Sequence, residues 1–402
     1  MGHHLGPARD APRGAPSEPR DGQECCALSD EATMSSSEAI DSLGYVESEA
    51  PDPSQGASSP VEVQTTAAWI ASLQLPSGMI PWFSAGHCDP WNHVEAAMAL
   101  SVAGWTDEAV RAFEWLESKQ HEDGSWCRYY LADGVEDPRR DPNVSAYVAT
   151  GAWWHFLVTG DADFLEHIWS VVDSAIGFSL GLQRPGGEVA WSADPDGRHA
   201  SYALLTSTSS IYHSLRAALA IAGCLGYDRP EWELAAPRMA EAIVKRPESF
   251  APKDRWAMDW YYPVLSGALD TDAGRERISE RWEEFVTEGV GVRCVADQPW
   301  FTAAETAECS VALDAIGLKS EAADLLRATG HMREEDGSYW TGCVHPECVR
   351  FPGGERSTYT AAAVIIAEHC LYGQGPASGV FRGETFAGPY EFVDVAETVA
   401  DS

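Results

Sequence analysis

Positively charged residues are scarce in this chain of 402 residues. It carries 27 Lys and Arg against 62 Asp and Glu, which gives a formal net charge of −35 at pH 7. Nucleic acids and anionic membranes bind proteins through a basic face, so this composition speaks against both as partners. It fits a soluble protein that acts on a neutral ligand, although an acidic surface also serves solubility alone.

Long apolar runs are missing as well. The N-terminus has no apolar segment of the kind found in secretory signals, and no run reaches the roughly 18 residues that span a bilayer. Ten cysteines occur at irregular spacings, and several fall on apolar helical faces, where free thiols pack as small hydrophobic groups. We therefore expect a cytoplasmic, reduced protein.

One cysteine motif suggests a metal. Cys343-x-His345-x-x-Cys348 contains residue types that bind zinc. Its spacing is not that of a standard zinc finger, and no second ligand pair of matching spacing follows. We expect neither a metal nor another cofactor.

Period-two alternation with hairpin turns is also absent, so we expect few strands. Six amphipathic segments instead alternate with six segments rich in apolar or small residues, and a helix that is apolar on most sides belongs inside. This alternation predicts an all-α fold, the (α/α)6 toroid, with buried helices inside an outer ring. The amphipathic segments are 64–75, 106–119, 161–182, 230–245, 272–288 and 319–332, and the apolar ones are 90–104, 143–158, 208–224, 257–269, 301–317 and 356–372.

The predicted toroid covers residues 61–372. Residues 1–60 are rich in Pro, Gly, Ser and acidic residues, which predicts a disordered tail. Residues 373–402 are again rich in Gly, Pro and acidic residues. We expect this second tail to be partly ordered, because Tyr390, Phe392 and Val393 offer apolar contacts with the toroid.

An ungapped repeat with an offset of 213 residues supports an array of helical hairpins. Glu95 and Glu308 recur at matching positions, and we interpret them as structural, buried and hydrogen-bonded. The same offset aligns Asn92 with Glu305 at the start of the first helix of each copy, and such a departure is a good place to look for chemistry. The matched segments extend to Glu122-Asp123-Gly124-Ser125 and Glu335-Asp336-Gly337-Ser338.

Loops that lead into the inner helices of a toroid gather at one mouth, and here they are rich in Trp, Tyr, His and carboxylates. Sugars present apolar C–H faces and polar edges, so aromatic side chains beside polar ones suit them. A single Trp more commonly packs between helices, but the clustering at corresponding loop positions favours a carbohydrate site. The side chains predicted to bind sugar are His87, Trp91, Asn92, His93, Asp141, Asn143, Tyr147, Trp191, Asp259, Trp260, Tyr262, Trp300 and Tyr359.

Glycoside hydrolysis commonly uses two carboxyl groups, a protonated acid and an ionised base or nucleophile. Asp89 and Glu305 are our pair, because each begins an inner helix. The apolar residues around Glu305 would raise its pKa and favour the acid role, whereas polar neighbours favour Asp89 as the base. The alternatives are a helix cap for Asp89 and a helix-dipole contact for Glu305. Asp141, Asp194 and Asp259 are reserve candidates.

Two longer runs resemble the six-hairpin glycosidases, over about residues 65–372: Asp141-Pro142-Asn143-Val144-Ser145-Ala146-Tyr147 and Trp153-Trp154-His155-Phe156. More narrowly, the chain is similar to actinobacterial proteins labelled prenyltransferase-like, a family that includes an endo-mannanase of α-1,4-linked methylmannose polysaccharide. The resemblance implies Asp89 and Glu305 as the catalytic carboxylates and such a polysaccharide as the substrate. We expect inverting, endo-acting hydrolysis.

A further motif keeps an alternative open. Gln120-x-x-x-Gly124-x-Trp126 resembles a motif of terpenoid cyclases, which share a related toroid, and we interpret it as a structural tie between helices. A terpene cyclase or prenyltransferase-like enzyme is thus the first alternative, although the Asp-x-Asp-Asp and Asp-Asp-x-x-Asp motifs are missing. A non-catalytic glycan-binding toroid is the second, and a lyase or epimerase is a lesser one. The sequence makes no prediction of oligomeric state.

Overall fold

The computed structural model describes residues 58–386, and twelve helices in this part match the twelve predicted segments. The predicted tails, as far as they cover residues 1–57 and 387–402 with Tyr390, Phe392 and Val393, lie outside the described residues. The amphipathic helices are α2 (Pro60–Leu73), α4 (Thr106–Lys119), α7 (Ala162–Gly181), α9 (Pro230–Lys245), α11 (Thr271–Glu280) and α14 (Lys319–Ala328). The apolar helices are α3 (Pro90–Val102), α6 (Val148–Thr159), α8 (Leu205–Leu225), α10 (Ala257–Leu265), α13 (Ala303–Ala315) and α15 (Thr358–Tyr372).

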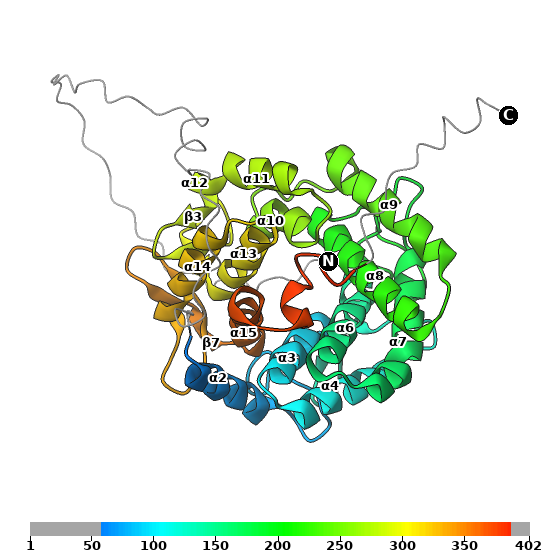
Figure 1. The fold of residues 1–402 in the computed structure, drawn as a ribbon, viewed down its shortest axis with the longest axis horizontal. Coiled ribbons are helices and arrows are strands. Elements are labelled where there is room, and N and C mark those ends of the chain that lie inside the picture. Colours follow the sequence, from blue (N-terminus) through cyan, green and yellow to red (C-terminus); the bar gives the residue numbers. More distant parts are fainter. Residues whose placement is uncertain (1–57, 387–402) are drawn as a thin grey trace, which may run out of the picture. The chain divides into compact units, whose positions relative to one another are not determined.

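The apolar helices form a closed inner ring. Each contacts the next in the order α3, α6, α8, α10, α13 and α15, and α15 contacts α3 again. Each also packs against at least one amphipathic helix of an outer layer, so that α15 is covered by α2 and α14, and α3 by α4 and α2 (Figure 1). None of the described helices is at once long and apolar enough to cross a lipid bilayer.

Enclosure on all sides explains the composition of the inner helices. Ala96, Ala97, Met98 and Ala99 follow one another along α3, and all four are fully buried. Four consecutive residues of a helix point in all directions around its axis, so α3 has no solvent face in this stretch. Small side chains allow it to approach several neighbours closely.

A glutamine amide ties successive outer helices together. Gln74, Gln120 and Gln183 each stand at the end of an outer helix, and each side chain donates to the carbonyl of the glycine four residues later. The same amide donates to a backbone carbonyl of the next outer helix at distances of 2.9–3.1 Å. The structural interpretation of the motif at residues 120–126 is therefore confirmed, and its Gln-x-x-x-Gly part occurs three times.

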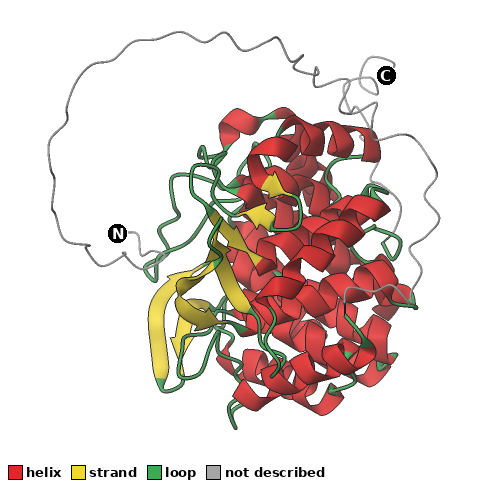
Figure 2. Cartoon of the chain, turned by 90° about the vertical axis from the view of Figure 1, so that its left-hand side faces the viewer, coloured by secondary structure: helices red, strands yellow, loops and turns green. Residues whose placement is uncertain are grey.

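The all-α prediction is wrong in one respect, because the described residues also contain two antiparallel sheets. β1 (Cys127–Leu131) and β2 (Gly134–Arg140) form a hairpin. The second sheet has the order β3–β4–β5–β6–β7 and includes the ends of the predicted helices 272–288, 301–317 and 356–372. Its strands are β3 (Val286–Thr287), β4 (Gly291–Arg293), β5 (Trp300–Thr302), β6 (Trp340–Val344) and β7 (Val349–Arg356). Figure 2 shows the strands gathered at one end of the helices.

These strands belong to a rim of loops that encircles the N-terminal ends of the inner helices. Each loop that enters an inner helix is hydrogen-bonded through its backbone to the loops of the neighbouring helices. The contacts are Thr358 N to Trp82 O, Cys88 N to Tyr130 O, Arg140 N to Ala193 O, Ala251 N to Ala203 O, Ala257 N to Cys294 O and the pairing of Phe301 in β5 with Cys343 in β6. The rim therefore holds the six loops in fixed positions relative to one another.

The 213-residue repeat is also a structural repeat. It relates α3 and α4 to α13 and α14, and the turns that follow α4 and α14 have the same geometry. Asp123 accepts a hydrogen bond from the backbone N–H of Ser125, as Asp336 does from Ser338. The glycine between the two residues has φ of 86° in both turns.

Substitution of Gly124 by Ala should destabilise the fold. The left-handed φ disfavours a side chain, and a Cβ would clash with the carbonyl oxygen of Ser174 on α7. We expect a loss of about 1–3 kcal/mol in the free energy of unfolding, measured by denaturant titration. Gly134→Ala is the matched control, because its Cβ would meet no atom within 4 Å. Equal stability of the two variants would contradict this account.

Candidate active site

Asp89 is held at the start of α3 by three hydrogen bonds. It is the N-cap, with Pro90 at the first helical position, and only 4% of its surface is exposed. Oδ1 accepts from the backbone N–H of Asn92 at 3.0 Å, and Oδ2 accepts from Asn92 Nδ2 at 2.7 Å and Trp82 Nε1 at 2.6 Å. A carboxylate has about four acceptor positions, so one on Oδ1 remains for a further donor such as water.

Aromatic rings surround this carboxylate. Trp82 lies edge-on to His87 and Tyr359, with ring centroids 4.4 and 4.9 Å apart. His87 Nδ1 lies 3.2 Å from a carboxylate oxygen of Glu136 on β2. Burial, followed by the charge of Asp89, raises the pKa of Tyr129 on β1 to about 12. The β1–β2 hairpin therefore contributes to the site, although Trp82 and Tyr129 are not among the residues predicted to bind sugar.

Glu305 lies in the first turn of α13 and is half-buried. Burial raises the pKa of its carboxyl group, which favours the protonated form. Burial raises the pKa of Tyr359 on α15 and of Tyr261 on α10, and the nearby Glu305 carboxyl group adds to both rises. In the inner ring, only α15 lies between α3, which Asp89 caps, and α13, which contains Glu305. Tyr359 on α15 contacts Trp82 beside Asp89 and also lies close enough to Glu305 to be affected by its charge.

The two copies of the repeat carry their carboxyl group at different positions of the helix start. The 213-residue offset aligns the N-cap Asp89 with the N-cap Thr302, and Asn92 with Glu305. The first copy therefore carries its acid at the N-cap, and the second carries it three residues later. At each of these two aligned positions only one copy carries an ionisable side chain. The two carboxyl groups therefore lie in different surroundings.

A second pair of carboxyl groups lies one turn further along the same helices. Glu95 and Glu308 line a cavity of about 20 Å³, enough for one water molecule. Glu308 accepts from the hydroxyl of Tyr262 at 3.1 Å and from that of Tyr261, while the Tyr147 hydroxyl donates to Glu95. The prediction that both acids are buried and hydrogen-bonded is confirmed for Glu95. Glu308 is hydrogen-bonded but only half-buried.

The protonation of this deeper pair follows from its surroundings. Burial and then the neighbouring Glu308 raise the pKa of Glu95 well above its ordinary value. Burial raises the pKa of Glu308 to about 8, opposed by the hydroxyl of Tyr261. Two carboxyl groups that approach each other in a poorly solvated space cannot both ionise readily.

The reserve carboxylates occupy three different surroundings. Asp141 caps the short helix α5 (Pro142–Ala146) by accepting from Asn143 N at 3.0 Å, and burial raises its pKa to about 6. Asp259 accepts from the hydroxyl of Thr206, and burial raises its pKa as well. Asp194 lines a separate hollow of about 490 Å³ between α7 and the 193–199 loop, which contains neither Asp89 nor Glu305. This hollow is also lined by Glu122 and Asp123, and Asp123 forms an ion pair with Arg140, which lines it too.

Three of the predicted sugar-binding tryptophans are half-buried and stacked on another ring. Trp91 stacks on Tyr147 with centroids 4.5 Å apart, and Trp300 stacks on Phe351 at 4.7 Å. Trp191 stacks on Tyr202, and the Arg128 guanidinium lies 4.6 Å from its ring. All three belong to the loops of the rim or to the first turn of an inner helix.

Two predicted binding residues are corrected by the structure. His93 is buried against the outer layer, where Nδ1 accepts from Ile80 N at 3.1 Å and Nε2 donates to Ala112 O at 2.9 Å. Burial lowers the pKa of His93 to about 4, so it is a neutral core residue. Trp260 donates to Arg277 O and stacks on Phe285, again between the layers. Both side chains point away from the mouth because of their position around the helix axis.

Comparison with known proteins identifies the family of this chain. No family model matches the chain. It is 51% identical over 328 residues to the MMP endo-(1,4)-3-O-methyl-alpha-D-mannosidase of Mycolicibacterium hassiacum, which covers 82% of this chain and 91% of that protein. The chain belongs to the family of this mannosidase. It is therefore a glycoside hydrolase, as the sequence predicts.

Solved structures of glycosidases share the fold of this mannosidase-family chain. A glycosidase in complex with glucose aligns with a TM-score of 0.62 at 16% identity, over 78% of this chain and 96% of that one. A mannosylglycerate hydrolase from Thermus thermophilus aligns with a TM-score of 0.59 at 12% identity, over 76% and 99%. At these identities the likeness concerns the fold alone.

Because the pKa of Glu308 is raised, the stability of the hydrolase should depend on pH. Between its ordinary pKa and the raised one, Glu308 keeps in the folded state a proton that the unfolded chain releases. Raising the pH from about 5 to about 8 should therefore lower the free energy of unfolding, by at most about 1.4 kcal/mol per pH unit for this group. Glu308→Gln should flatten this dependence, measured by denaturant titration across the pH range. The control Glu283→Gln, at an exposed position, should keep the wild-type profile.

Proposed function

We propose that this glycoside hydrolase cleaves an α-1,4-linked methylmannose polysaccharide at internal bonds and inverts the anomeric configuration. The observation that carries the proposal is the placement of two carboxyl groups, in unlike surroundings, at the N-terminal ends of α3 and α13. The name of the mannosidase that is 51% identical supports the substrate and the internal cleavage.

In the proposed reaction Glu305 is the general acid and Asp89 is the general base. Glu305 gives its proton to the glycosidic oxygen of the leaving sugar, and burial keeps that proton available. A water molecule bound at the free acceptor position of Asp89 Oδ1 loses a proton to Asp89 and attacks the anomeric carbon from the opposite face. Solvent then returns the proton to Glu305 and removes the one on Asp89.

Several side chains around this pair are proposed to bind the sugar. Trp300 and Trp191 offer aromatic faces to C–H groups, as does Trp91 in the first turn of α3. Polar edges are served by His87, Asn92, Asp141, Asn143 and Tyr359, and by Asp259 at the start of α10. Tyr147 and Tyr262 lie deeper, where they hold Glu95 and Glu308, so we now assign them to the support of the site.

We further propose that the two concentric layers are the (α/α)6 toroid of the six-hairpin glycosidases, over about residues 61–372. The closed contacts of the inner helices and the fold likeness to glycosidases support this assignment. A cytoplasmic location remains part of the proposal, with eight free cysteines in the described residues in its favour. We propose no nucleic-acid or membrane partner, on the grounds of the net charge of −35.

Amide substitution of either carboxyl group should abolish most of the turnover and leave the fold intact. We expect Asp89→Asn and Glu305→Gln each to lower kcat by about 10²–10⁴-fold, the usual contribution of a general acid or base. Asparagine is a good N-cap, so the stability of Asp89→Asn should change little. The assay incubates each variant with methylmannose polysaccharide, α-1,4-mannan oligomers and α-1,4-glucan, with products read by mass spectrometry and anomeric configuration by NMR.

Matched controls separate catalysis from helix capping. Asp270 caps the outer helix α11 by accepting from Ala273 N at 2.9 Å, and Glu321 lies in the first turn of α14. Asp270→Asn and Glu321→Gln should retain wild-type turnover. Near-normal activity in both Asp89→Asn and Glu305→Gln would overturn the assignment of the pair. Saccharide binding without any cleavage by the wild type would favour a non-catalytic toroid, and turnover of an isoprenyl diphosphate would favour the prenyltransferase-like alternative.

A further inference from the structure

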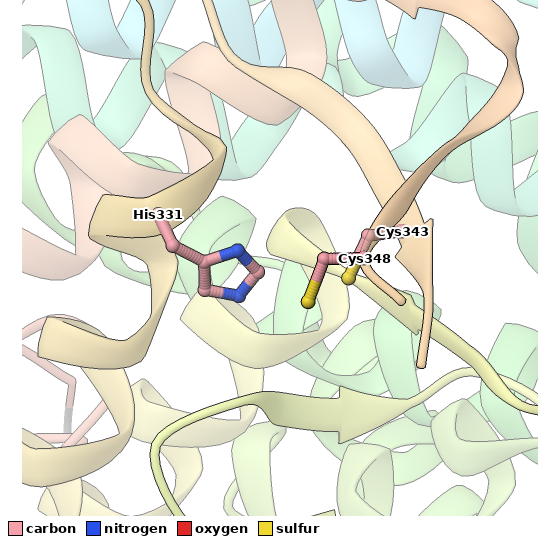
Figure 3. Close-up of side chains that lie close together, drawn as sticks. All are labelled: His331, Cys343 and Cys348. Carbon is pink, nitrogen blue, oxygen red and sulfur yellow. The ribbon is translucent and has the colours of Figure 1, made fainter. Parts of the chain in front are cut away.

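Three soft ligands from separate parts of the chain meet beside the β6–β7 hairpin. His331 belongs to the short helix η3 (Thr329–Met332), Cys343 lies on β6, and Cys348 ends the turn that leads into β7. One side-chain ligand atom from each lies within 4.8 Å of the other two, and Figure 3 shows the imidazole facing both thiols. Neither thiol is in a disulfide.

The imidazole is already oriented by a second contact. Its Nε2 atom lies 3.0 Å from the carbonyl oxygen of Val290, which accepts a hydrogen bond when Nε2 carries the proton. That tautomer leaves Nδ1 unprotonated, the form in which histidine coordinates a metal. Arg350 holds the same segment by donating to the carbonyl oxygen of His331 at 3.1 Å. A hydrogen bond from the second ring nitrogen to a backbone carbonyl is the usual support of a histidine ligand.

The histidine in the sequence motif is not the one that lies beside the two thiols. His345 lies between the two cysteines in sequence, but its ring packs against Phe301 with centroids 5.6 Å apart. His331, twelve residues before Cys343, takes the place at the thiols because η3 packs against β6. The spacing of the sequence motif is therefore no argument against a metal.

We propose that His331, Cys343 and Cys348 bind one Zn²⁺ ion or another thiophilic divalent cation. Two thiolates and a neutral imidazole form a common zinc ligand set, and a water molecule or a further side chain completes a tetrahedron. Bonds of about 2.0–2.3 Å place tetrahedral ligand atoms about 3.3–3.8 Å apart, so the three side chains need to approach by about 1 Å. Binding releases the two thiol protons, and the ion and the two thiolates then carry no net charge.

The proposed metal site lies where an ion would stabilise the structure of the rim. β6 pairs with β5, which leads into the first turn of α13 with Glu305, and Phe351 on β7 stacks on Trp300. A metal at the turn would fasten the hairpin to η3 and to Val290, and would thereby steady this part of the rim. The ion takes no part in bond cleavage, so the metal proposal is independent of the proposed substrate.

The thiols determine how metal binding at this site depends on pH. Burial, together with the neighbouring Cys348, raises the pKa of Cys343 to about 11, and Arg350 opposes this rise. The metal-free site therefore holds a thiol that a metal must deprotonate. Metal affinity should increase as the pH rises, because fewer protons then compete for the sulfur.

The test uses the full chain, purified under reducing conditions, stripped of metal and titrated with Co²⁺ and then with Zn²⁺. We expect one equivalent of Co²⁺ to give the visible bands of tetrahedral coordination and an ultraviolet thiolate-to-cobalt charge-transfer band, with both displaced by Zn²⁺. Zn²⁺ should also raise the Tm. Metal content of protein produced with zinc in the medium should be one ion per chain.

Variants make the assignment specific. The Cys348→Ser variant changes an exposed residue, so it should fold normally. Cys348→Ser and His331→Ala, as single variants, should each weaken Co²⁺ binding by about 100-fold or more and reduce the charge-transfer band. Cys224→Ser is the matched control, because Cys224 is also an exposed free thiol but lies on α8, and it should bind as the wild type does.

Three results would overturn the proposal. The first is Co²⁺ binding without a thiolate band, and the second is equal affinity of the wild type and Cys348→Ser. The third is a Cys343–Cys348 disulfide in the reduced preparation, seen as a mass two hydrogen atoms lower in the peptide that contains both residues.

Discussion

Closure of the inner ring is the constraint on which the rest of the structure depends. Because α15 contacts α3, every inner helix has an inner neighbour on both sides and an outer helix behind it. This enclosure demands small and apolar residues on most faces, as in α3, and it leaves the polar chemistry to the helix ends. The six N-terminal ends meet at the rim, where loops from distant parts of the chain are hydrogen-bonded to one another. Helix N-termini carry partial positive charge, yet burial outweighs this effect at Glu305, Asp141 and Asp259, whose pKa values are raised.

The two pairs of acids along α3 and α13 differ in the groups that donate hydrogen bonds to them. Asp89 accepts three hydrogen bonds and keeps one acceptor position, whereas Glu305 is half-buried and its pKa is raised. One turn deeper, Glu95 and Glu308 share a cavity with room for one water molecule and are held by tyrosine hydroxyls. Both pairs consist of carboxylic acids, Asp89 with Glu305 and Glu95 with Glu308. Asp89 and Glu95 are each 4% exposed, and Glu305 and Glu308 are both half-buried, so it is the available hydrogen-bond donors that distinguish the pair proposed for proton transfer from the deeper pair.

The repeat shows how similar segments acquire different chemistry. Both copies have the same hairpin, the same Asp-Gly-Ser turn and the same deep glutamate. They differ in whether the acid stands at the N-cap or three residues later, which changes its hydrogen bonds and its burial. At the same offset, the β1–β2 hairpin and the Cys88–Tyr130 bridge of the first copy match the β6–β7 hairpin and the Phe301–Cys343 pair of the second. The second copy differs in carrying Trp300 and the cluster of His331, Cys343 and Cys348 on this side of the rim.

The sequence by itself determined the twelve helices, their alternation between layers and the two candidate carboxylates, because periodicity and helix-start signals act over short distances. It did not determine the strands, since β5 has three residues and pairs with β6 about 40 residues later. Nor did it separate His93 from Asn92: adjacent helical residues point about 100° apart, so the facing of each depends on how the helix is rotated in the ring. The meeting of His331 with the two cysteines was likewise decided by tertiary structure alone, because only the packing of η3 against β6 brings these side chains together.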